Sequence, residues 1–598
     1  MPKLTFLILF LIHSLNCLQI ETKLEGKPFY ELSQTSANLI DEKITTKFIL
    51  SPKDSWVGLE LSSPAKIAKI GFTHTSSEPK DYLLGIFQGA NDKTFFDAFP
   101  LYMIKEEIEP DKTIFFEISC PKSFKYLRYV GPKNKNESIS FFEIYGALDS
   151  NGELLKELKE DMFQPTNLPL LVINSENGEM PKGRDKETKV KANFLLVNEG
   201  KVNMKKTGTI KLRGNSSLNS EKKPYLINFD EKTLVLDMPA NAKKWTLIPN
   251  MYDKTLMRNI LGYKMSFIFG LKFSPSCRFI DLILNGDYVG NYMICDKIEV
   301  GKDRVDITKM DETCIQEPEI SGGYLVQGTG SSWGMDPGTF KTDKGITLSY
   351  EYPKAEDITE EQKIYLKNKL DEIEAKVYEN ITENIDLESF ARYFLVEDFS
   401  ANQDGIFNSF YLYKERSDDK IYFGPVWDFD LAFDNAMILY PTNEKKNFAY
   451  KFALSNGPAD KFLSNLLSND TVLQKVKDTW KLMTNTVFTK KVMRDYINEL
   501  FELIYESQRL NYIRWDVLNT RQFMEAVIRG SFEAEVDYLK EYVEERFDVF
   551  GQIVANATSA SVLEEYPRPG PWGGGGKNRW KKNENNIEEG SRNNNDKN

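Results

Sequence analysis

Short runs of alternating apolar and polar residues, separated by turn residues, fill the first part of the chain. Four of these runs are Ser55–Leu61, Ile67–Phe72, Tyr82–Phe87 and Thr113–Ile118. A period of two puts neighbouring side chains on opposite faces of a strand, and this spacing of turns is typical of a β-sandwich. We therefore expect an all-β sandwich domain over residues 19–150.

The hydrophobic pattern changes beyond residue 150. Residues 151–167 are charged and end among prolines, which predicts a linker. A second domain follows over residues 168–563, strand-rich at first and then, from about Thr359, with apolar residues three and four positions apart. The expected helices are Glu360–Tyr378, Leu387–Asp398, Lys461–Thr484, Thr489–Ser507 and Ser531–Phe550. Strands followed by helices predict an α+β fold with two lobes.

The two ends of the chain have patterns of their own. Residues 1–18 hold one lysine, an apolar run and then smaller or polar residues, which is the order of a signal peptide. A buried N-terminal helix is the alternative, but the run is short and begins at the start of the chain. Residues 564–598 are rich in glycine, asparagine and charge, so we expect a disordered polar tail. We expect the mature chain to lack a transmembrane segment and to be secreted or held in the lumen of the secretory pathway.

The amino-acid composition excludes several classes of binding and catalytic site. The length of 598 residues and the hydrophobic fraction of 41% support more than one core. The net charge of −12 argues against a nucleic-acid partner, because such binding needs a basic face. The 2 histidines include His13 of the expected signal peptide, which excludes a multi-histidine zinc site and leaves a serine–histidine–aspartate site only His74. Any chemistry therefore runs on carboxylates, amides and lysines, which hold magnesium and phosphate.

Cysteines and glycosylation sequences fit an oxidising compartment. The chain has 5 cysteines, of which Cys17 belongs to the expected signal peptide. The others are Cys120, Cys277, Cys295 and Cys314, which allow two disulfides in three different pairings. The sequence does not choose between these pairings. Asn-x-Ser/Thr sequences, which carry glycans where they are exposed in a secreted protein, occur at Asn136, Asn215, Asn380, Asn469 and Asn556.

A glycine turn followed by a lysine pair is the first candidate for chemistry. Residues Ile210–Ser217 read as a strand that ends in an Arg-Gly-Asn-Ser turn, and Glu221–Phe229 read as a strand that begins at two lysines. The backbone N–H groups of such a turn can cradle an anion, and a lysine on the next strand can reach the same anion. The alternative is an ordinary turn between two strands.

Acidic residues inside aromatic runs are the second candidate. One run carries Asp404 and Asn408, and the next carries Asp428 and Asp430. Acidic side chains are costly to bury unless they bind cations or partners. Phosphoryl transfer needs such a set, because one carboxylate orients the acceptor hydroxyl while an amide and another carboxylate hold magnesium on the phosphates. Calcium binding or plain loop capping is the alternative.

Two further segments contribute motifs. Lys244–Asn259 contains Trp-Thr-Leu-Ile-Pro-Asn-Met-Tyr-Asp and ends in Arg-Asn. Asp281–Asp296 contains an Asn285-Gly286 pair between apolar residues, which predicts a tight β-hairpin.

Taken in order, these motifs resemble the spore coat protein H (CotH) kinase family. The matching patterns are Arg-Gly-Asn-Ser, Lys-Lys-Pro-Tyr, Trp-x-Leu-x-x-Asn-x-x-Asp-x-Thr-x-x-Arg-Asn, Leu-Asn-Gly-x-Tyr-x-Gly-x-Tyr, Gly-Gly-Tyr-Leu, Asp-Gly and Trp-Asp-x-Asp. They cover residue 168 to about residue 440. The resemblance implies a two-lobed atypical protein-kinase-like fold. It also implies transfer of the γ-phosphoryl group of ATP to serine or threonine of a protein, with Mg²⁺ or Mn²⁺ as the metal.

The resemblance also implies roles for individual residues. Asp404 is expected to be the catalytic carboxylate near the acceptor hydroxyl, and Asp428 a metal ligand, with Asp430 sharing or supporting that role. The residues expected at the ATP phosphates are Lys223 or its neighbour Lys222, Arg213, Gly214, Asn215 and Asp296. The residues expected to shape the site between the lobes are Asn250, Asp253 and Arg258.

Three positions depart from the family pattern. Ser409 stands where the family has a metal-binding asparagine, and Asn408 lies one residue earlier. A one-residue shift on a strand reverses the face of a side chain, so Asn408 needs a bulge to reach the metal. Asp296 replaces a glutamate, and Gln327 replaces an acid after Gly-Gly-Tyr-Leu. A glycan at Asn215 would block the phosphate turn, so we expect that asparagine to be unmodified.

Other readings of the chain stay open. Segments Tyr126–Pro132 and Ser140–Gly146 resemble a discoidin-like (galactose-binding-like) sandwich, which implies adhesion or glycan binding. A non-catalytic (pseudokinase) surface or adhesion protein is therefore an alternative to a kinase that acts on a secreted or surface protein. A glycosidase with Asp404 and Asp428 as its carboxylate pair is a further alternative, but it leaves the lysine and glycine turn without a role.

Overall fold

A computed structural model of the chain describes residues 22–29, 48–50, 56–75, 78–133, 135, 137–148, 161–183, 185–329, 338–377, 379–436, 447–452, 458–525 and 527–564. The expected signal peptide, most of the expected linker and nearly all of the expected tail lie outside these residues. The chain divides into two compact units. Unit 1 comprises Met1–Pro249, Cys277–Cys295 and Glu502–Asp516, and unit 2 comprises Asn250–Ser276, Asp296–Phe501 and Val517–Asn598. Within the described ranges, no helix is long and apolar enough to cross a membrane.

Unit 1 begins with an antiparallel β-sandwich. Its strands are β1 (Thr22–Lys23), β2 (Gly26–Phe29), β3 (Phe48–Leu50), β4 (Trp56–His74), β5 (Ile86–Ala90), β6 (Phe99–Met103), β7 (Ile114–Glu117), β8 (Ser123–Val130) and β9 (Glu137–Leu148). The long strand β4 pairs with β2 and β8 mainly through its first half and with β7 and β9 through its second half. One continuous set of strands therefore folds into two layers, and the expected all-β domain is confirmed.

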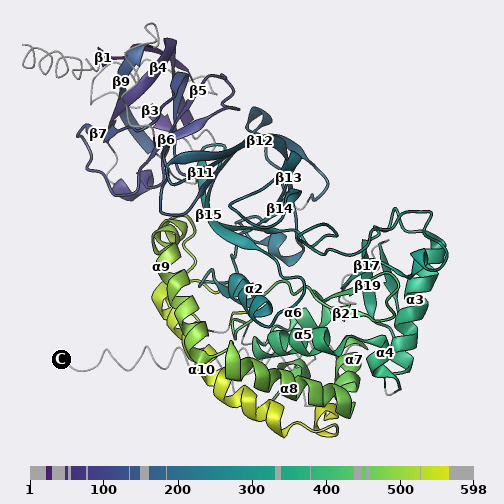
Figure 1. Cartoon of the computed structure of the whole chain (residues 1–598). Coiled ribbons are helices and arrows are strands. Elements are labelled where there is room, and N and C mark those ends of the chain that lie inside the picture. Colours follow the sequence, from purple (N-terminus) through teal and green to yellow (C-terminus); the bar gives the residue numbers. More distant parts are fainter. Residues whose placement is uncertain are drawn as a thin grey trace, which may run out of the picture. The chain divides into compact units, whose positions relative to one another are not determined.

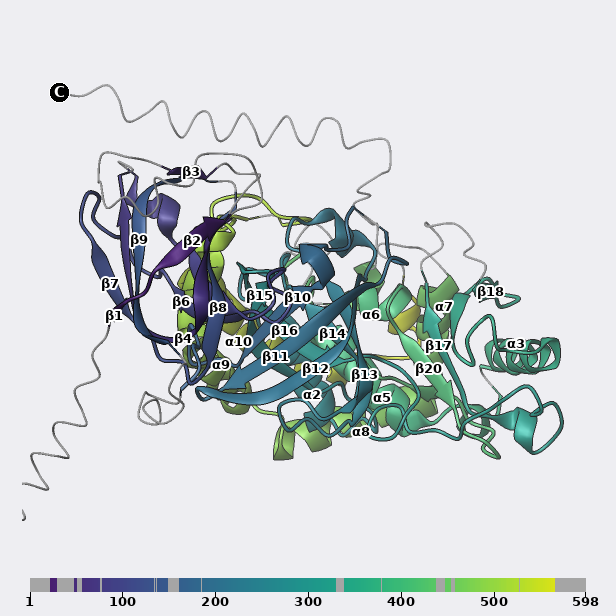
Figure 2. The same ribbon diagram turned by 90° about the horizontal axis from the view of Figure 1, so that it is seen from above.

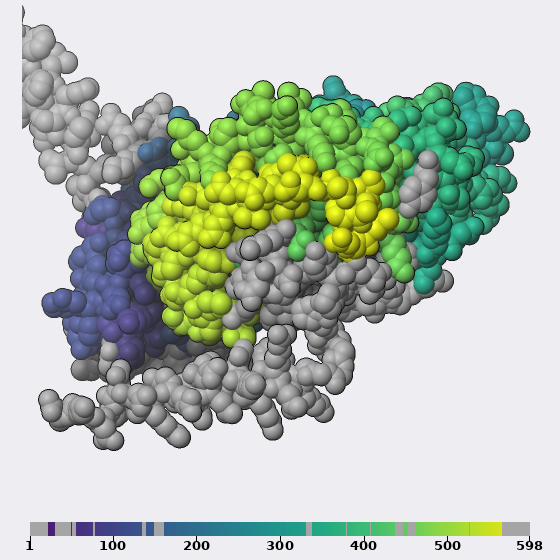
Figure 3. All heavy atoms as spheres, turned by 90° about the horizontal axis from the view of Figure 1, so that it is seen from below, coloured from purple at the N-terminus to yellow at the C-terminus, as the bar shows by residue number. Residues whose placement is uncertain are grey.

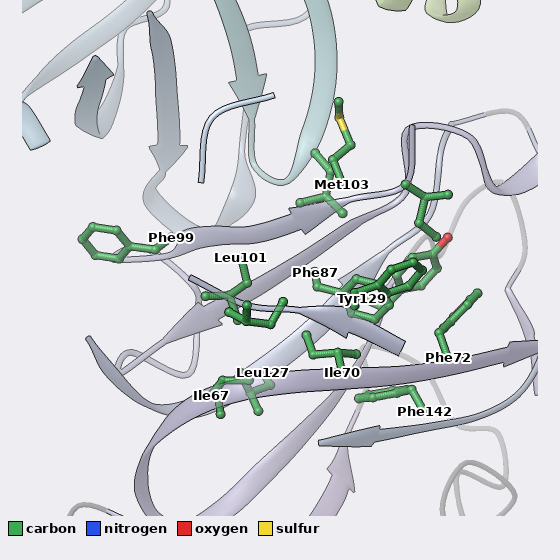
Figure 4. Packing of buried hydrophobic residues seen from close by; sticks show 14 of the residues in the cluster. Ile67, Ile70, Phe72, Phe87, Phe99, Leu101, Met103, Leu127, Tyr129 and Phe142 are labelled. Carbon is green, nitrogen blue, oxygen red and sulfur yellow. The ribbon is translucent and has the colours of Figure 1, made fainter. Parts of the chain in front are cut away.

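Aromatic side chains fill the space between the layers (Figure 4). The ring of Tyr129 lies 5.0 Å from that of Phe72 and 4.9 Å from that of Phe87. The two runs expected at Ser55–Leu61 and Ile67–Phe72 are parts of β4, whose register shifts between Glu60 and Ala65. Such a register shift changes the direction of a strand without ending the strand. The alternating pattern on either side does not predict the shift.

The rest of unit 1 is a closed barrel of seven strands. These are β10 (Leu170–Ser175), β11 (Val190–Asn198), β12 (Lys201–Leu212), β13 (Tyr225–Thr233), β14 (Ala242–Ile248), β15 (Cys277–Leu284) and β16 (Asp287–Asp296). The order around the barrel is β10-β11-β12-β13-β14-β16-β15. Closure leaves no unpaired edge, and alternate residues such as Ile280, Leu282 and Ile294 fill the interior. The expected hairpin at Asn285-Gly286 joins β15 to β16.

Unit 2 combines a small sheet with helices. The sheet has the order β18 (Thr339–Lys341), β19 (Thr347–Tyr352), β17 (Tyr324–Gly328), β20 (Tyr411–Lys414) and β21 (Tyr422–Phe423). The helices are α2 (Arg258–Ile268), α3 (Glu360–Ala375), α4 (Ile381–Asn384), α5 (Leu387–Phe399), α6 (Asp404–Phe407), α7 (Pro458–Leu467), α8 (Asp470–Thr486), α9 (Lys490–Arg514) and α10 (Phe532–Asn556). Helix α3 lies beside the sheet (Figures 1 and 2). Residues 502–514 of α9 belong to unit 1.

Four of the five expected helices lie where the hydrophobic pattern places them. Helices α3, α5, α9 and α10 begin within one residue of the expected positions. The single helix expected at Lys461–Thr484 is wrong, because α7 ends at Leu467 and α8 starts at Asp470. Asn469 caps α8, its side-chain oxygen accepting the Thr471 N–H at 3.0 Å.

The helices of unit 2 enclose an aromatic core. The ring of Trp480 in α8 lies 4.9 Å from that of Phe550 in α10, and Phe399 of α5 packs against both. Figure 3 shows α10, in yellow, on the surface beside the green helices that precede it. The α+β fold class expected from strands followed by helices is confirmed.

Candidate active site

Four aspartates of unit 2 lie close enough for their charges to affect one another. Asp404 opens the short helix α6, Asp428 and Asp430 flank Phe429 after β21, and Asp253 precedes α2. Burial, followed by the charges of Asp428, Asp404 and Asp253, raises the pKa of Asp430 well above its usual value. Burial and the charge of Asp428 raise the pKa of Asp404 to about 7. A cation bound near these carboxylates would relieve the repulsion between them.

Helix α2 holds the Asp428–Asp430 turn in place. The side-chain oxygen of Asn259 accepts the backbone N–H of Phe429 at 2.7 Å. The ring of Tyr263 stacks on Trp427 with centroids 5.7 Å apart. Gly262 allows this close approach, because a Cβ there would lie 2.4 Å from the Phe429 ring. The backbone of Asp428 itself is in the left-handed region, at a φ of 69°.

The turn that carries Asp404 is held by helix α5. Glu397, buried in α5, accepts a hydrogen bond from the Asn402 side-chain amide at 2.8 Å. The hydroxyl of Tyr393 donates to the backbone oxygen of Gly405 at 2.6 Å. A Cβ on Gly405 would lie 2.1 Å from a carboxylate oxygen of Glu397, so any larger residue directly after Asp404 would displace Glu397 or the turn. This packing explains the Asp-Gly pair that the sequence showed.

The three residues expected to shape the site come together at the start of α2. Asp253 accepts hydrogen bonds from the N–H of Thr255 at 2.9 Å and of Arg258 at 2.7 Å, and it pairs with the Arg258 guanidinium. Asn250, whose φ is 49°, accepts the side-chain amide of Asn259 at 3.0 Å. Asn259 therefore joins this cluster to the Asp428–Asp430 turn. Sequence reasoning gave Asn259 no role, although it ends the Arg-Asn pair of the motif.

Asn408 does not lie on a strand. It is the residue after α6, and its N–H donates to the backbone oxygen of Asp404 at 3.0 Å, while Ser409 N–H donates to the same oxygen at 2.7 Å. Strand β20 begins only at Tyr411. The expectation that Asn408 needs a β-bulge is therefore wrong, because the alternation of faces applies only within a strand.

The expected phosphate turn belongs to unit 1. It joins β12 to β13, and Gly214 has a φ of 92° with no room for a Cβ beside Ser217. The Asn215 side chain accepts a hydrogen bond of 3.1 Å from Lys186. Arg213 is half-buried, and its N–H donates to the Pro224 oxygen at 3.3 Å.

The two neighbouring lysines have different surroundings. Lys223 is half-buried and its ammonium donates to the Leu218 oxygen at 2.6 Å, which leaves two N–H bonds for a ligand. The buried ammonium of Lys222 donates to the backbone oxygens of Pro249 and Asn291 and to the Asn511 side chain. All three N–H bonds of the Lys222 ammonium are used within the protein, so Lys222 has a structural role. Lys223 is then the remaining lysine of the pair that could bind the ATP phosphates. Burial lowers the pKa of Lys222 well below its usual value.

Asp296 is paired within unit 2. Its carboxylate accepts a hydrogen bond of 2.9 Å from the Arg304 guanidinium and one of 3.0 Å from the Ser276 N–H. Burial raises the pKa of Asp296, and the charge of Arg304 opposes that rise. These partners make Asp296 a residue that supports the start of the Lys297–Val305 loop.

The CotH kinase protein family matches residues 210–550. The chain belongs to this family. The recognition made on the ordered motifs is confirmed, and the match includes both the glycine turn of unit 1 and the aspartates of unit 2. The inner spore coat protein H of Bacillus subtilis (strain 168) is 25% identical over 239 residues, which are 38% of this chain and 60% of that relative.

Solved structures similar to the chain include carbohydrate-binding modules. The CBM62 module of Clostridium thermocellum Xyl5A is 25% identical, covering 21% of this chain and 98% of the module, with a TM-score of 0.20. The C-terminal domain of a Bacteroides fragilis chitobiase is 14% identical and covers 21% of this chain and 99% of that domain, with a TM-score of 0.18.

The acidic cluster of this CotH kinase chain fits a divalent cation. In the ranges that the structure describes, no three histidine, cysteine, aspartate or glutamate side chains gather as a metal site. A magnesium ion needs fewer protein ligands than such a site provides, because one or two carboxylates and substrate phosphates are its usual ligands. Asp428 and Asp430 carry the hard carboxylate oxygens that it prefers. Burial first, and then repulsion from the neighbouring aspartates, raise the pKa of Asp430, and a bound cation would offset both effects.

Proposed function

We propose that the protein is an ATP-dependent kinase that phosphorylates serine or threonine of secreted or surface proteins. The observation that carries the proposal is that Asp404, Asp428 and Asp430 lie close enough for their charges to act on one another in a chain of the CotH kinase family. Membership of the family supports kinase-type phosphotransfer. The hydroxyl acceptor and the secretory location are proposed from the resemblance and from the pattern of residues 1–18.

Each of these residues has one of the roles that phosphoryl transfer requires. Asp404 orients the acceptor hydroxyl and accepts its proton, and a pKa of about 7 suits a general base near neutral pH. Asp428 and Asp430, together with Asn408, would hold Mg²⁺ or Mn²⁺. When bound, the metal would supply positive charge that offsets the charge of the transferred phosphoryl group. Lys223 and the Gly214 turn bind the ATP phosphates.

A non-catalytic surface protein is the second candidate. Two positions depart from the family pattern here, because Gln327 replaces an acid and Asp296 replaces a glutamate. Gln327 is an amide whose side-chain oxygen accepts the Tyr411 hydroxyl at 3.0 Å, and Asp296 is held by Arg304. In this case the sandwich of unit 1 would bind glycans or a protein partner, and the kinase-like domain would act as a scaffold.

Phosphate transfer from labelled ATP separates the two candidates. The mature chain is incubated with MgCl₂ or MnCl₂, beside Asp404→Asn, Asp428→Asn and a matched Asp419→Asn control. Asp419 is chemically identical, but its side chain is 86% exposed in the loop between β20 and β21. We expect incorporation by the wild type and the control, and a loss of at least about 100-fold in the other two variants. No incorporation and no thermal shift with ATP and metal would instead favour the scaffold.

Secretion has its own test. The full chain and a chain that starts at residue 19 are expressed in eukaryotic cells, and the medium and lysate are compared. Release of the full chain alone supports the secretory location, whereas equal retention of both contradicts it.

A further inference from the structure

Two cysteines stand directly opposite each other on neighbouring barrel strands. Cys277 opens β15, Cys295 is the penultimate residue of β16, and the antiparallel register pairs them. Side chains of directly opposed residues leave a sheet on the same face. Both are buried, with 5% and 0% of their surface exposed. The two thiols therefore face each other in a space closed to solvent.

The hydrogen bonds next to the pair decide its spacing. Asp296 N–H donates to the Ser276 oxygen at 2.9 Å, which makes residues 276 and 296 a hydrogen-bonded pair. Hydrogen-bonded and non-hydrogen-bonded pairs alternate along an antiparallel ladder, so Cys277 and Cys295 form a non-hydrogen-bonded pair. The Cα atoms of such a pair are about 4.5 Å apart. Disulfides span Cα separations of about 4.4–6.8 Å, so this position accommodates one without moving the backbone.

The other two cysteines of the described chain have different neighbours. The thiol of Cys120 donates to the sulfur of Met162 at 3.9 Å in the sandwich core. The sulfur of Cys314 lies 3.6 Å from an Asp311 carboxylate oxygen and 3.6 Å from the Arg416 guanidinium. Neither lies opposite a cysteine in a strand pair, so Cys277–Cys295 is the bond that the strand register supports.

We propose that Cys277 and Cys295 form a disulfide that links β15 to β16 when the chain folds in an oxidising compartment. The oxidant is a disulfide, either a small molecule such as oxidised glutathione or a protein oxidoreductase. The thiolate of one cysteine attacks it, forming a mixed disulfide and expelling one thiolate. The second cysteine thiolate then attacks the protein sulfur, which forms the bond and releases the other oxidant thiolate. Two protons leave the protein thiols, and the oxidant gains two electrons.

The bond acts on the barrel and is independent of phosphoryl transfer. It closes the loop that contains the Asn285-Gly286 turn, and it lies beside β14, where the Thr246 hydroxyl donates to the Cys295 backbone oxygen at 3.2 Å. A covalent link of this kind lowers the entropy of the unfolded chain, so it stabilises unit 1.

Peptide mapping tests the bond directly. Trypsin cuts after Lys272, Arg278 and Lys297, so Cys277 and Cys295 fall in the separate peptides 273–278 and 279–297. The full chain is prepared by secretion from eukaryotic cells, and a reduced sample is reoxidised with oxidised glutathione. Free thiols are blocked with iodoacetamide in denaturant before digestion without reductant. We expect the linked pair 273–278 with 279–297 in both preparations, with Cys120 and Cys314 alkylated.

Either of two results overturns the proposal. One is recovery of both Cys277 and Cys295 as alkylated peptides, and the other is linkage of either residue to Cys120 or Cys314. Thermal unfolding gives a second measure that needs no linked peptide. Reductant should lower the midpoint of the wild type and of a Cys314→Ser control by about 5 °C. It should leave the Cys277→Ser/Cys295→Ser double variant unchanged, and an equal response of all three proteins contradicts the bond.

Discussion

The ammonium group of Lys222 donates a hydrogen bond of 2.8 Å to the side-chain oxygen of Asn511, a residue 289 positions further along the chain. The same oxygen accepts the Asn291 N–H at 3.2 Å. A Cβ on Gly290 would lie 2.4 Å from it, so the glycine lets the helix approach the strand. Together these contacts fasten the C-terminal half of α9 to the barrel of unit 1.

This relationship predicts that the two adjacent lysines behave differently. Lys222→Met removes the donor of three buried acceptors, so we expect unit 1 to lose about 3 kcal/mol of unfolding free energy. Lys223→Met removes one half-buried hydrogen bond and should cost about 1 kcal/mol or less. Under the proposed function Lys223→Met weakens ATP binding at least about tenfold, because its charge contacts the phosphates.

Urea unfolding and ATP titration of the folded proteins measure both effects. Wild-type stability in Lys222→Met would show that the anchor is unimportant. Unchanged ATP affinity in Lys223→Met, in a protein that binds ATP, would remove this lysine from the site.

The glycine after Asp404 is expected to be essential for activity. In Gly405→Ala the added Cβ would meet the Glu397 carboxylate at 2.1 Å, and because that carboxylate is buried and bonded to Asn402, we expect the turn and Asp404 to shift. We expect phosphate transfer to fall at least about tenfold, since displacements of this size misplace a catalytic group. The matched control is Gly301→Ala, because a Cβ on Gly301 meets no atom within 4 Å. Equal loss in both variants would mean that the effect is not local to Asp404.

A buried ion pair should dominate the stability of the helices in unit 2. The Arg546 guanidinium in α10 donates to the Asp398 backbone oxygen at 2.9 Å, and lies 3.3 Å from its carboxylate. Asp398 also accepts the N–H groups of Ala449 and Tyr450. Arg546→Met removes the ion-pair partner of a buried carboxylate and leaves only the weaker charge of Lys451 nearby, so we expect a loss of about 3–5 kcal/mol.

A surface pair provides the comparison for Arg546→Met. Lys491 pairs with Asp495 one turn along α9, and the Lys491 side chain is 83% exposed. Lys491→Met should change the unfolding free energy by about 0.5 kcal/mol or less. Similar losses in the two variants, measured by chemical unfolding, would contradict the importance of burial.

His74 is expected to make stability depend on pH. Its buried ring donates from Nε2 to the Ile108 oxygen at 2.9 Å, and burial lowers its pKa from the ordinary value of 6.5. Below pH 6.5 the unfolded chain binds a proton that the folded chain does not. The contribution of His74 to stability is therefore present above that pH, falls as the pH decreases, and levels off below the pKa of the folded state.

Comparison with His74→Gln isolates this effect. The change in urea midpoint between pH 7.5 and pH 5.5 should be smaller in the variant, because all other titrating groups are common to both proteins. Parallel changes in the two proteins would show that His74 takes up its proton equally in both states.

Local signals in the sequence determined much of the secondary structure. The Asn285-Gly286 pair predicted a two-residue hairpin, and both residues have positive φ, at 51° and 90°. Thr359 and Gln362 form the capping box that starts α3, where the hydrophobic pattern placed its beginning. These predictions succeed because the interactions behind them lie within a few residues of chain. The break at Asn469 had a local signal too, an asparagine before an acidic first turn.

Only the tertiary structure decided which side chains meet. The sequence picked out Asp404, Asp428 and Asp430, but it did not reveal that Asn259 holds the Asp428–Asp430 turn. It also left open which lysine is anchored and which cysteines are opposed. Burial and contact depend on segments that are distant in sequence and that the hydrophobic pattern does not relate to one another. The charge, accessibility and hydrogen-bond partners of a site residue are therefore properties of the packed chain, while the residue types that make the chemistry available are already present in the sequence.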